Sequence, residues 1–387
     1  MFFKTILIKI FSRSMIFLFQ FLKLVGLNIR INELETRSIG HYSKSIEMYI
    51  LENQNKTSKY IDIWFRNKKI ANRFLYNKWK KYLNVFPPFF GHIYYCLINE
   101  KKLEFLIPYR HWRQYDNWNI DINQTLLKNK PLIQFTEKEK ENAKNILNKF
   151  KIKLNKNFFC FANRDSKYRF SNHINENIRN FSIHDYNYLL DKVVDAKTSA
   201  VRLGKNHFEK ISLENKSVYD YPYLDIEDDS LEFYLMSKCN FFISGDSGIN
   251  YYSTLFRKPL LMINVGPYVL RDWSNENCEL TIFKKFYSKK LKRNLSYFES
   301  EEVFYNYNDL PKIFEKLDLE VINNTPNEIF DLTNEFTLRK NNEWTVKDDE
   351  IEIQNTIQKF SKKMFSRNFK KINLGYEFAK QNIELFK

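Results

Sequence analysis

Apolar and polar residues along the first third of the chain alternate between patterns typical of strands and of helices. Short apolar runs predict strands at 29–34, 61–65 and 83–86. The stretches between them predict helices at 42–53 and 69–82, and another helix after the loop at Pro87–Pro88 leads to the apolar run 103–110. Strands that alternate with helices indicate a parallel sheet joined by crossovers.

The second half contains denser apolar runs. They predict strands at 157–162, 199–204, 240–245 and 259–266. Helices are expected between and beside them, at 182–196, 230–239 and 247–257. Apolar runs without polar alternation are typical of strands that are covered on both faces. The pattern therefore predicts an α/β fold with parallel sheets in both halves of the chain.

A polar, irregular stretch at 117–135 separates the halves. Thr136 follows it, with Glu139 three positions later, which is the capping-box pattern at the start of a helix. We place a domain boundary there. The chain is expected to divide into four parts: an N-terminal segment at 1–28, a first domain at 29–135, a second domain at 136–325, and C-terminal helices at 326–387 that return to the first domain.

The N-terminal segment is apolar but interrupted by basic residues, namely Lys4, Lys9, Arg13 and Lys23. Its longest clean run, Met15 to Leu22, is shorter than the ~20 residues that span a bilayer. No small-x-small cleavage site of a secretory signal follows. We expect an amphipathic helix that lies on the cytoplasmic leaflet of a membrane. A helix packed on the protein itself is the alternative.

Composition favours a globular protein, since 43% of the 387 residues are hydrophobic and 28% are charged. The net charge of +16 raises the question of nucleic acid. However, the lysines are spread along most of the chain, and the richness in Lys, Asn, Ile, Phe and Tyr is typical of an AT-rich genome. We therefore expect a mildly basic surface and no nucleic-acid partner, with an anionic membrane as the next explanation.

The four cysteines, Cys96, Cys160, Cys239 and Cys278, lie far apart and form no C-x-x-C spacing. Most of them stand among apolar or aromatic residues. This pattern predicts buried free thiols in a reducing compartment, without a disulfide framework or a zinc site.

The glycine-poor chain places three of its eight glycines between Asn240 and Gly266. A strand is expected to end at Ser244, followed by a turn at Gly245 and a helix that begins near Asp246 or Ser247. Amides at a helix start bind anions, and ligands of parallel sheets bind beyond the carboxyl ends of the strands. Gly245 and Gly248 would let phosphate oxygens approach the backbone.

The carboxylate of Asp246 would repel a phosphate. We expect it to be the N-cap of the following helix, with its oxygens turned onto the amides one turn ahead. Ser247 and the amide of Gly248 would then face the ligand. A tight turn without any ligand is the alternative. The loop is neither a Walker sequence nor a G-x-G-x-x-G motif.

Two arginines stand at the ends of neighbouring predicted strands. Arg164 follows the strand 157–162 by two residues, and Arg202 with Gly204 closes the next one. A guanidinium group suits a diphosphate because its donors match two oxygens at once. A surface turn made by Arg164 and Asp165 is the alternative.

These segments resemble, in order, a family of bacterial glycosyltransferases with the GT-B fold. The resemblance is carried by "FCFANRDSKYR", "RNFSIHDYNYLLDKV", "AVRLGK" and "FYLMSKCNFFISGDSGINYYSTLFRKPLLMINVGPY", and by "RSIGHYSKSIEMYI", "YRHWRQYDNW" and "YEFAKQNIELF" elsewhere. It covers roughly residues 29 to 385. The D-S-G loop is also similar to that of heptosyltransferases, although Asn250 to Tyr252 stand where those enzymes usually have a histidine.

The resemblance implies a GT-B architecture, with two Rossmann-like domains whose parallel sheets face each other across a cleft. The second domain would hold a nucleotide-diphospho-sugar, which is a substrate and not a cofactor, and the first an acceptor. The implied donor-binding residues are Arg164, Ser166 and Tyr168 for the diphosphate, Arg202 and Gly204 for the nucleoside, and Gly245, Asp246, Ser247 and Gly248 for the phosphate loop. Their positive charge and amides would stabilise the departing diphosphate.

No metal is expected, because this fold usually needs none and the sequence has no D-x-D triplet. An inverting transfer needs a general base near the acceptor hydroxyl. His41, at the first strand-to-helix turn, is one candidate, since a histidine has an ordinary pKa near 6.5. Asp116 is the other, with Arg110 and Arg113 as acceptor contacts. A lone histidine at a turn is more often structural.

The sequence thus predicts a cytoplasmic glycosyltransferase, peripheral on the inner face of the cell membrane. It would transfer a sugar from a nucleotide-diphospho-sugar to a cell-surface glycan or a lipid-linked acceptor. One alternative keeps the fold and makes the protein a sugar-nucleotide epimerase. Another is a basic nucleic-acid-binding protein, whose affinity would fall steeply with salt.

Overall fold

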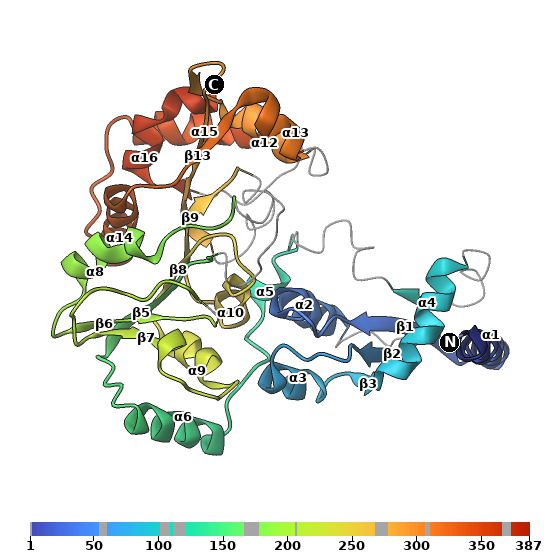
Figure 1. The fold of residues 1–387 in the computed structure, drawn as a ribbon. Coiled ribbons are helices and arrows are strands. Elements are labelled where there is room, and N and C mark those ends of the chain that lie inside the picture. The colour runs from blue at the N-terminus through green and yellow to red at the C-terminus, as the bar shows by residue number, and fades with distance from the viewer. Residues whose placement is uncertain are drawn as a thin grey trace. The chain divides into compact units, whose positions relative to one another are not determined.

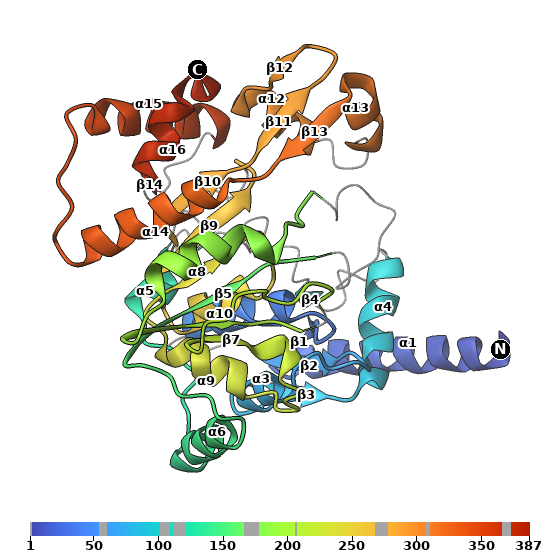
Figure 2. The same cartoon turned by 60° about the vertical axis from the view of Figure 1, so that its left-hand side comes forward.

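The computed structural model describes residues 2–53, 60–100, 109–110, 121, 123–165, 178–205, 207–267, 278–305, 310–365 and 373–387. The chain forms two compact units, Met1–Ile133 and Gln134–Lys387. Their division falls close to the boundary expected between residues 135 and 136. Each unit is built on its own parallel sheet (Figures 1 and 2).

The first unit has a four-stranded sheet in the order β3-β2-β1-β4, with every pair parallel. Its strands are β1 (Asn28–Leu34), β2 (Tyr60–Arg66), β3 (Asn84–Phe86) and β4 (Tyr109–Arg110). Its helices are α1 (Phe2–Leu24), η1 (Ile39–Tyr42), α2 (Lys44–Asn53), α3 (Arg73–Trp79), η2 (Pro88–Phe90), α4 (Gly91–Asn99) and α5 (Thr125–Lys128). These elements agree with the predicted alternation of strands and helices.

Helix α3 begins later than predicted because Asn72 caps it. The side chain of Asn72 accepts a hydrogen bond from the Leu75 amide at 2.8 Å. The hydroxyl of Tyr42 donates to the carbonyl of Asn72 at 2.8 Å, and the Trp79 indole donates to the carbonyl of Tyr42 at 2.6 Å. This chain of contacts fixes α3 to the turn that follows β1.

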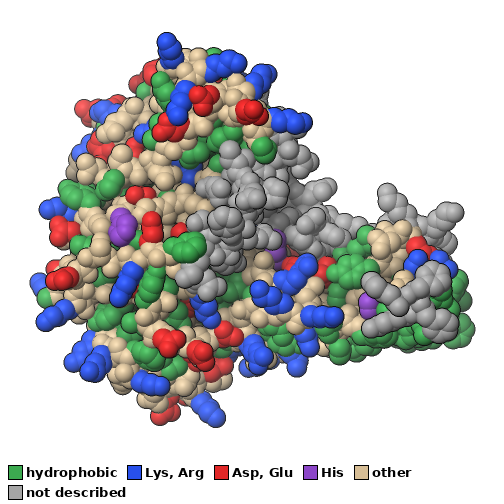
Figure 3. Space-filling model, in the orientation of Figure 1, with side chains coloured by type: hydrophobic (Ala, Val, Ile, Leu, Met, Phe, Trp, Pro, Cys, Tyr) green, Lys and Arg blue, Asp and Glu red, His purple; other side chains and the backbone are tan. Residues whose placement is uncertain are grey.

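Helix α1 packs one face on the first unit and leaves another exposed. Ile16 and Phe19 are buried in a core shared with β1, β2 and α4. Other apolar side chains of the helix lie in solvent, namely Ile6, Leu7, Ile10, Phe17, Leu18, Phe21 and Leu24. Figure 3 shows hydrophobic side chains gathered where this helix lies. By length and composition Thr5–Leu24 could cross a membrane, and 17% of its most apolar window is buried.

The second unit has a seven-stranded parallel sheet in the order β14-β10-β9-β8-β5-β6-β7. Its strands are β5 (Asn157–Ala162), β6 (Thr198–Arg202), β7 (Val218–Asp220), β8 (Phe242–Ser244), β9 (Leu260–Val265), β10 (Cys278–Phe283) and β14 (Asn373–Leu374). A small antiparallel sheet adds β11 (Lys285–Ser288), β12 (Arg293–Asn294) and β13 (Leu319–Ile322).

Helices accompany both sheets of the second unit. They are α6 (Glu137–Lys149), η5 (Ile183–Tyr186), α8 (Asn187–Val193), η6 (Tyr221–Tyr223), α9 (Leu231–Lys238), α10 (Asn250–Leu255), α12 (Tyr297–Tyr305), α13 (Leu310–Leu317), α14 (Pro326–Lys340), α15 (Glu350–Phe365), α16 (Tyr376–Gln381) and η8 (Ile383–Phe386). The predicted capping box is present at α6, where Thr136 and Glu139 exchange hydrogen bonds.

The order of the large sheet is that of a doubly wound Rossmann fold. The chain enters at the central strand β5, proceeds outward to β6 and β7, and then crosses to β8, β9 and β10 on the other side. The direction of winding changes between β5 and β8. The residues of β9 are all buried, as expected for a strand covered on both faces. The predicted α/β class with Rossmann-like parallel sheets is therefore confirmed.

The C-terminal helices belong to the second unit. Helix α14 contacts α8, β10 and α16, and η8 contacts α15. The ring of Phe386 lies 4.6 Å from that of Tyr297 and 5.4 Å from that of Phe360, measured between centroids. Residues 326–387 are thus part of the second unit and not a separate segment, and their expected return to the first domain stays a prediction. The four cysteines are buried and free, as predicted.

Candidate functional site

The carboxyl ends of β5 and β8 meet at the point where the winding of the large sheet changes direction. Ligands of doubly wound sheets bind in this place, because the crossovers on either side diverge there. The residues that follow the strands of this edge are Asn163, Arg164 and Asp165 after β5, Gly204 after β6, Gly245 and Asp246 after β8, and Lys284 after β10.

The turn after β8 needs glycine because an aromatic ring lies against it. A Cβ atom on Gly245 would stand 2.6 Å from Cε1 of Phe181 and 3.4 Å from the carbonyl oxygen of Ile263. The distance to the Phe181 ring is far shorter than a van der Waals contact, so the ring would have to move, whereas the distance to the Ile263 oxygen is an ordinary contact. The carbonyl of Gly245 accepts a hydrogen bond from the Asn250 side chain at 2.7 Å. Gly245 is therefore required by packing, independently of the predicted phosphate contact.

Helix α10 begins at Asn250, and not near Asp246 or Ser247 as predicted. The amide of Asn250 donates to the carbonyl of Ser247 at 3.1 Å, and the amide of Tyr251 to that of Gly248 at 3.4 Å. Ser247 and Gly248 thus form a turn that precedes the helix. The N-cap position is taken by Ile249, which has no side-chain cap.

The predicted N-cap role of Asp246 is wrong for the same reason. Its carboxylate is directed to Arg179, with 2.9 Å between Oδ2 and Nε, and its carbonyl accepts from the same Nε at 3.1 Å. Arg179 lies just before Phe181, far from Asp246 in sequence. The negative charge that would repel a phosphate is therefore compensated by an arginine that the sequence did not single out.

Another basic residue stands close to this pair. Lys284 directly follows β10, is 2% exposed, and donates to the carbonyl of Ile178. Burial lowers the pKa of its ammonium group to about 7, although the carboxylate of Asp246 acts in the opposite direction. The edge of the sheet thus carries Arg179 and Lys284 close to Asp246. Arg164 contacts the same segment through its carbonyl, which accepts a hydrogen bond from the Phe181 amide at 3.0 Å.

Arg164 and Asp165 do not form a surface turn, because both side chains are buried. The Asp165 carboxylate accepts from the Phe208 amide at 2.8 Å and lies 3.3 Å from Nδ1 of His207. Burial lowers the pKa of His207 to about 4. The segment that carries Arg164 is therefore held by contacts to the loop after β6.

Arg202 ends β6 as predicted, but its side chain is bound within the protein, and its predicted contact with a nucleoside stays a prediction. It is 0% exposed, and its guanidinium donates to the carbonyl of Glu209 at 2.7 Å, to Asp220 at 3.1 Å and to Oδ1 of Asn163 at 2.9 Å. Asn163 in turn donates to the carbonyl of Phe181 at 3.0 Å. This geometry assigns Arg202 a positioning role: it orients Asn163, which joins the ends of β5 and β6 to the segment before η5.

Gly204 is held by a carboxylate. Its φ of +113° is unfavourable for other residues, and a Cβ atom there would stand 2.7 Å from Nε2 of His207. Its amide donates to Oε1 of Glu232 at 2.7 Å. Burial raises the pKa of Glu232. The Gly204 amide is thus engaged within the protein, and the predicted contact of this residue with a nucleoside is untested.

The remaining predicted residues are only partly described. Ser166, Tyr168, Arg113 and Asp116 lie outside the described residues, as does the side chain of Arg110, whose backbone forms β4. His41 lies in η1, beyond the carboxyl end of β1, and its amide donates to the carbonyl of Ser38 at 3.1 Å. The catalytic role of His41 stays a prediction.

Two buried carboxylates at the carboxyl end of β1 were missed by sequence reasoning. Glu33 accepts from Asn67 at 2.9 Å and from the hydroxyl of Tyr95 at 3.1 Å. Glu35 pairs with Arg37. The signal in the sequence is the segment "NELETR", where two acidic residues stand at the end of a predicted strand. Within the described ranges, no three His, Cys, Asp or Glu side chains are grouped so as to hold a metal ion.

Comparison with solved structures finds distant similarities. The chain is similar to heptosyltransferase II of E. coli, with a TM-score of 0.42 and 14% identity over 66% of this chain and 90% of that one. It is also similar to a family 9 glycosyl transferase of Veillonella parvula, with a TM-score of 0.38 and 12% identity over 61% of this chain and 81% of that one.

A third similarity is to S. aureus MnaA in a structure with UDP, with a TM-score of 0.32 and 14% identity over 61% of this chain and 79% of that one. No protein-family model matches the chain, and no curated protein matches it. The expected likeness to glycosyltransferases of the heptosyltransferase type is thus found, as a distant structural similarity.

Proposed function

We propose that the protein is a glycosyltransferase of GT-B architecture that binds a nucleotide-diphospho-sugar in its second unit. The observation that carries this proposal is the cluster of Arg164, Arg179 and Lys284 at the carboxyl edge of the large sheet, where Arg164 and Lys284 both contact the segment 178–181 that contains Arg179. A diphosphate brings negative charge to this edge. Asp246 is the acidic residue within the cluster, and its charge is compensated by Arg179.

Arg179 is the cation of the cluster that a ligand reaches most readily, because its side chain is 31% exposed whereas Lys284 is buried. Guanidinium groups form paired, charge-assisted hydrogen bonds to phosphate oxygens. Fixed cations at this edge stabilise the nucleoside diphosphate as it departs with the electron pair of the broken bond to the sugar. The predicted contacts of Ser166, Tyr168 and the 245–248 loop would complete the donor site.

The acceptor would bind the first unit, with His41 or Asp116 as the general base and with Arg110 and Arg113 as contacts. The base takes the proton of an acceptor hydroxyl, whose oxygen then attacks the anomeric carbon of the donor. We propose a cell-surface glycan or a lipid-linked glycan as the acceptor. The reaction is proposed to need neither a metal nor a cofactor, since fixed cations replace them.

We further propose that the protein is cytoplasmic and associates with the inner face of the cell membrane through α1. The exposed apolar face of this helix is flanked by basic residues, namely Lys9, Arg13 and Lys23. Such a face inserts at the boundary between headgroups and acyl chains, and basic residues beside it are attracted by anionic lipids.

Thermal unfolding in the presence of nucleoside diphosphates and nucleotide sugars tests the donor site. A ligand at about 100 times its dissociation constant adds about 2.7 kcal/mol to the free energy of unfolding. We expect one nucleotide to raise the melting temperature, and the rise to be lost in Arg164→Ala and Arg179→Ala. Arg293→Ala is the matched control, because Arg293 pairs with Glu299 at the protein surface.

Analysis of the reaction products then distinguishes a glycosyltransferase from an epimerase. A glycosyltransferase releases nucleoside diphosphate in an acceptor-dependent manner, whereas an epimerase converts the nucleotide sugar without an acceptor. The absence of any nucleotide-dependent shift, together with salt-sensitive binding of nucleic acid, would overturn the proposal.

A further inference from the structure

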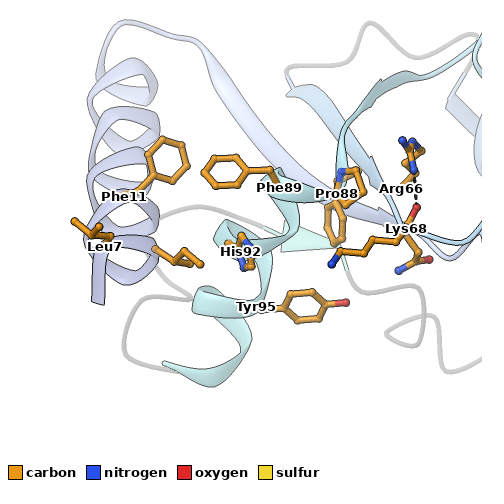
Figure 4. A pocket seen from close by; sticks show the side chains of 11 residues that line it. Leu7, Phe11, Arg66, Lys68, Pro88, Phe89, His92 and Tyr95 are labelled. Atoms are coloured by element: carbon orange, nitrogen blue, oxygen red, sulfur yellow. Dashed lines mark hydrogen bonds between the residues drawn. The ribbon is translucent and has the colours of Figure 1, made fainter. Parts of the chain in front are cut away.

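A pocket of about 780 Å³ lies in the first unit between α1 and α4 (Figure 4). Leu7, Ile8 and Phe11 of α1 form one side of it, and Phe89 of η2 faces them. The Phe11 and Phe89 rings are in contact, with 5.0 Å between their centroids. A volume of this size is within the range of small-molecule sites, roughly 300–1,000 Å³.

The apolar wall is open to solvent. Leu7 is 54% exposed and Phe89 is 47% exposed. Leu7 also lies one helical turn from the exposed Ile10, and Phe17 follows two turns later, so the apolar wall adjoins the exposed face of α1. Apolar surface that is both concave and continuous with such a face favours a ligand that arrives from a lipid phase, since its chain then never has to cross water.

The other end of the pocket is basic. Arg66 ends β2 and Lys68 follows it, and Figure 4 shows both at the end remote from Leu7 and Phe11. None of the described residues that line the pocket is acidic. The nearby carboxylate of Glu33 is 6% exposed and is bound by Asn67 and Tyr95, so it is not directed into the pocket.

We propose that this pocket binds one lipid molecule that carries a phosphate head. Its alkyl or isoprenoid chain would lie against Leu7, Phe11 and Phe89, and its phosphate would lie at Arg66 and Lys68. The pairing of an apolar wall with a cationic end selects against both uncharged lipids and free phosphate. That this lipid carries the glycan acceptor rests on the proposed function, whereas the binding site itself does not.

Binding of alkyl phosphates to the full chain tests the site. Octyl, decyl and dodecyl phosphate are titrated below their micelle concentrations by calorimetry, with inorganic phosphate and dodecyltrimethylammonium as comparison ligands. We expect the affinity to rise about fourfold for each methylene group added. Inorganic phosphate and the cationic surfactant should bind at least 100-fold more weakly than dodecyl phosphate.

Two variants and two matched controls locate the ligand. Phe89→Ser should weaken dodecyl phosphate at least tenfold, and Lys68→Gln should reduce its preference over the cationic surfactant at least fivefold. Lys69→Gln alters the neighbouring lysine, which does not line the pocket, and Phe208→Ser alters an exposed phenylalanine of the second unit. Both controls should bind as the unaltered protein does.

Affinity that is independent of chain length, or that Phe89→Ser leaves unchanged, would overturn the inference. Binding to phosphatidylglycerol vesicles without binding of monomeric dodecyl phosphate would also overturn it and would show surface attachment alone. The nucleotide-induced thermal shift is recorded on the same samples. A nucleotide shift without alkyl phosphate binding refutes only the pocket, and alkyl phosphate binding without a nucleotide shift refutes only the proposed function.

Discussion

The guanidinium of Arg179 and the carboxylate of Asp246 are paired at 2.9 Å, although 67 residues separate them in the chain. The pair connects the turn after β8 to the segment that precedes η5. It also sets the charge of the candidate site, because an uncompensated Asp246 would oppose the binding of a diphosphate. Substitutions of these two residues should therefore change the affinity for a nucleotide in opposite directions.

Removal of Arg179 should weaken a nucleoside diphosphate, whereas neutralisation of Asp246 should strengthen it. Arg179→Ala removes a charge-assisted contact worth about 1.5–3 kcal/mol and leaves the Asp246 charge uncompensated. Asp246→Asn removes the repulsion and releases Arg179 for the ligand. Calorimetric titration of each variant, and of the double variant, with the nucleotide that shifts the melting temperature measures both effects. Equal affinities in Asp246→Asn and the unaltered protein would contradict this assignment.

Gly245→Ala should destabilise the second unit through its contact with Phe181. The added methyl group would stand 2.6 Å from the Phe181 ring, and overpacking of this kind costs about 1–3 kcal/mol. Urea unfolding measures the loss. Because the cause is steric, Phe181→Leu should be less harmful in the Gly245→Ala background than in the unaltered protein. Additive effects of the two substitutions would mean that Gly245 is required for another reason.

These two contacts also show what the sequence could predict and what it could not. The apolar runs at 157–162 and 259–266 identified β5 and β9, because a strand covered on both faces leaves a local signature. The pattern also located the strand ends that carry Arg164 and Gly245. The roles of these residues depend on partners that are distant in sequence, so no local pattern contains them.

Asp246 shows where prediction from a local pattern fails. Its position after a strand is typical of an N-cap, but the folded chain brings Arg179 to its carboxylate instead. Arg202 is similar: its place at a strand end suggested ligand binding, but Asn163 and Asp220 lie within reach of its guanidinium. The strands β10 to β14 were not predicted, although β10 is as long as β5 and β9. The strands β11 to β14 have only two to four residues, and their pairing partners define them more than their own composition does.

His207 should make the protein less stable in acid. Burial holds its folded pKa at about 4, below the ordinary value of 6.5. Between these values the unfolded chain binds a proton that the folded protein does not, so the free energy of unfolding falls as pH decreases through this window. The contribution is on the order of 3 kcal/mol.

The contribution of His207 is measured by urea unfolding of the unaltered protein and of His207→Asn between pH 7 and pH 4. The difference between their free energies of unfolding cancels the contributions of the other titrating groups. Asp185 is one of these groups, since burial raises its pKa to about 6 and its effect has the opposite sign. His184→Asn is the control, because His184 is exposed. A stability difference that stays constant over this pH range would contradict a buried neutral His207.

Lys284 should make the free energy of unfolding depend on pH above pH 7. Burial lowers its folded pKa to about 7 from the ordinary 10.5. Between these values the unfolded chain retains a proton that the folded protein has lost, so the contribution of Lys284 to stability increases from pH 7 to pH 10 by on the order of 4 kcal/mol. In Lys284→Gln this increase should be absent. Lys290→Gln, on the exposed surface, should retain it. Parallel pH profiles of all three proteins would contradict the prediction.

The exposed face of α1 should be what attaches the protein to a membrane. Phe17 and Phe21 are each 61% exposed, and complete burial of a phenylalanine contributes about 1.5–3 kcal/mol. Phe17→Ser with Phe21→Ser should therefore lower the affinity for vesicles of phosphatidylcholine and phosphatidylglycerol about 100-fold or more in a flotation assay. Phe208→Ser, which alters an equally exposed phenylalanine of the second unit, should have no effect.

The salt dependence of vesicle binding distinguishes the electrostatic contribution from the apolar contribution. Lys9, Arg13 and Lys23 each gain about 1 kcal/mol near an anionic surface, and this gain is screened as ionic strength rises. Arg13 is also paired with Glu100 at 2.6 Å, so Lys9 and Lys23 should contribute more to vesicle binding than Arg13 does. The double serine variant should bind vesicles only at low salt, whereas the unaltered protein should keep part of its binding at high salt. If both proteins dissociate at the same salt concentration, the attachment is electrostatic and the apolar face of α1 has another role.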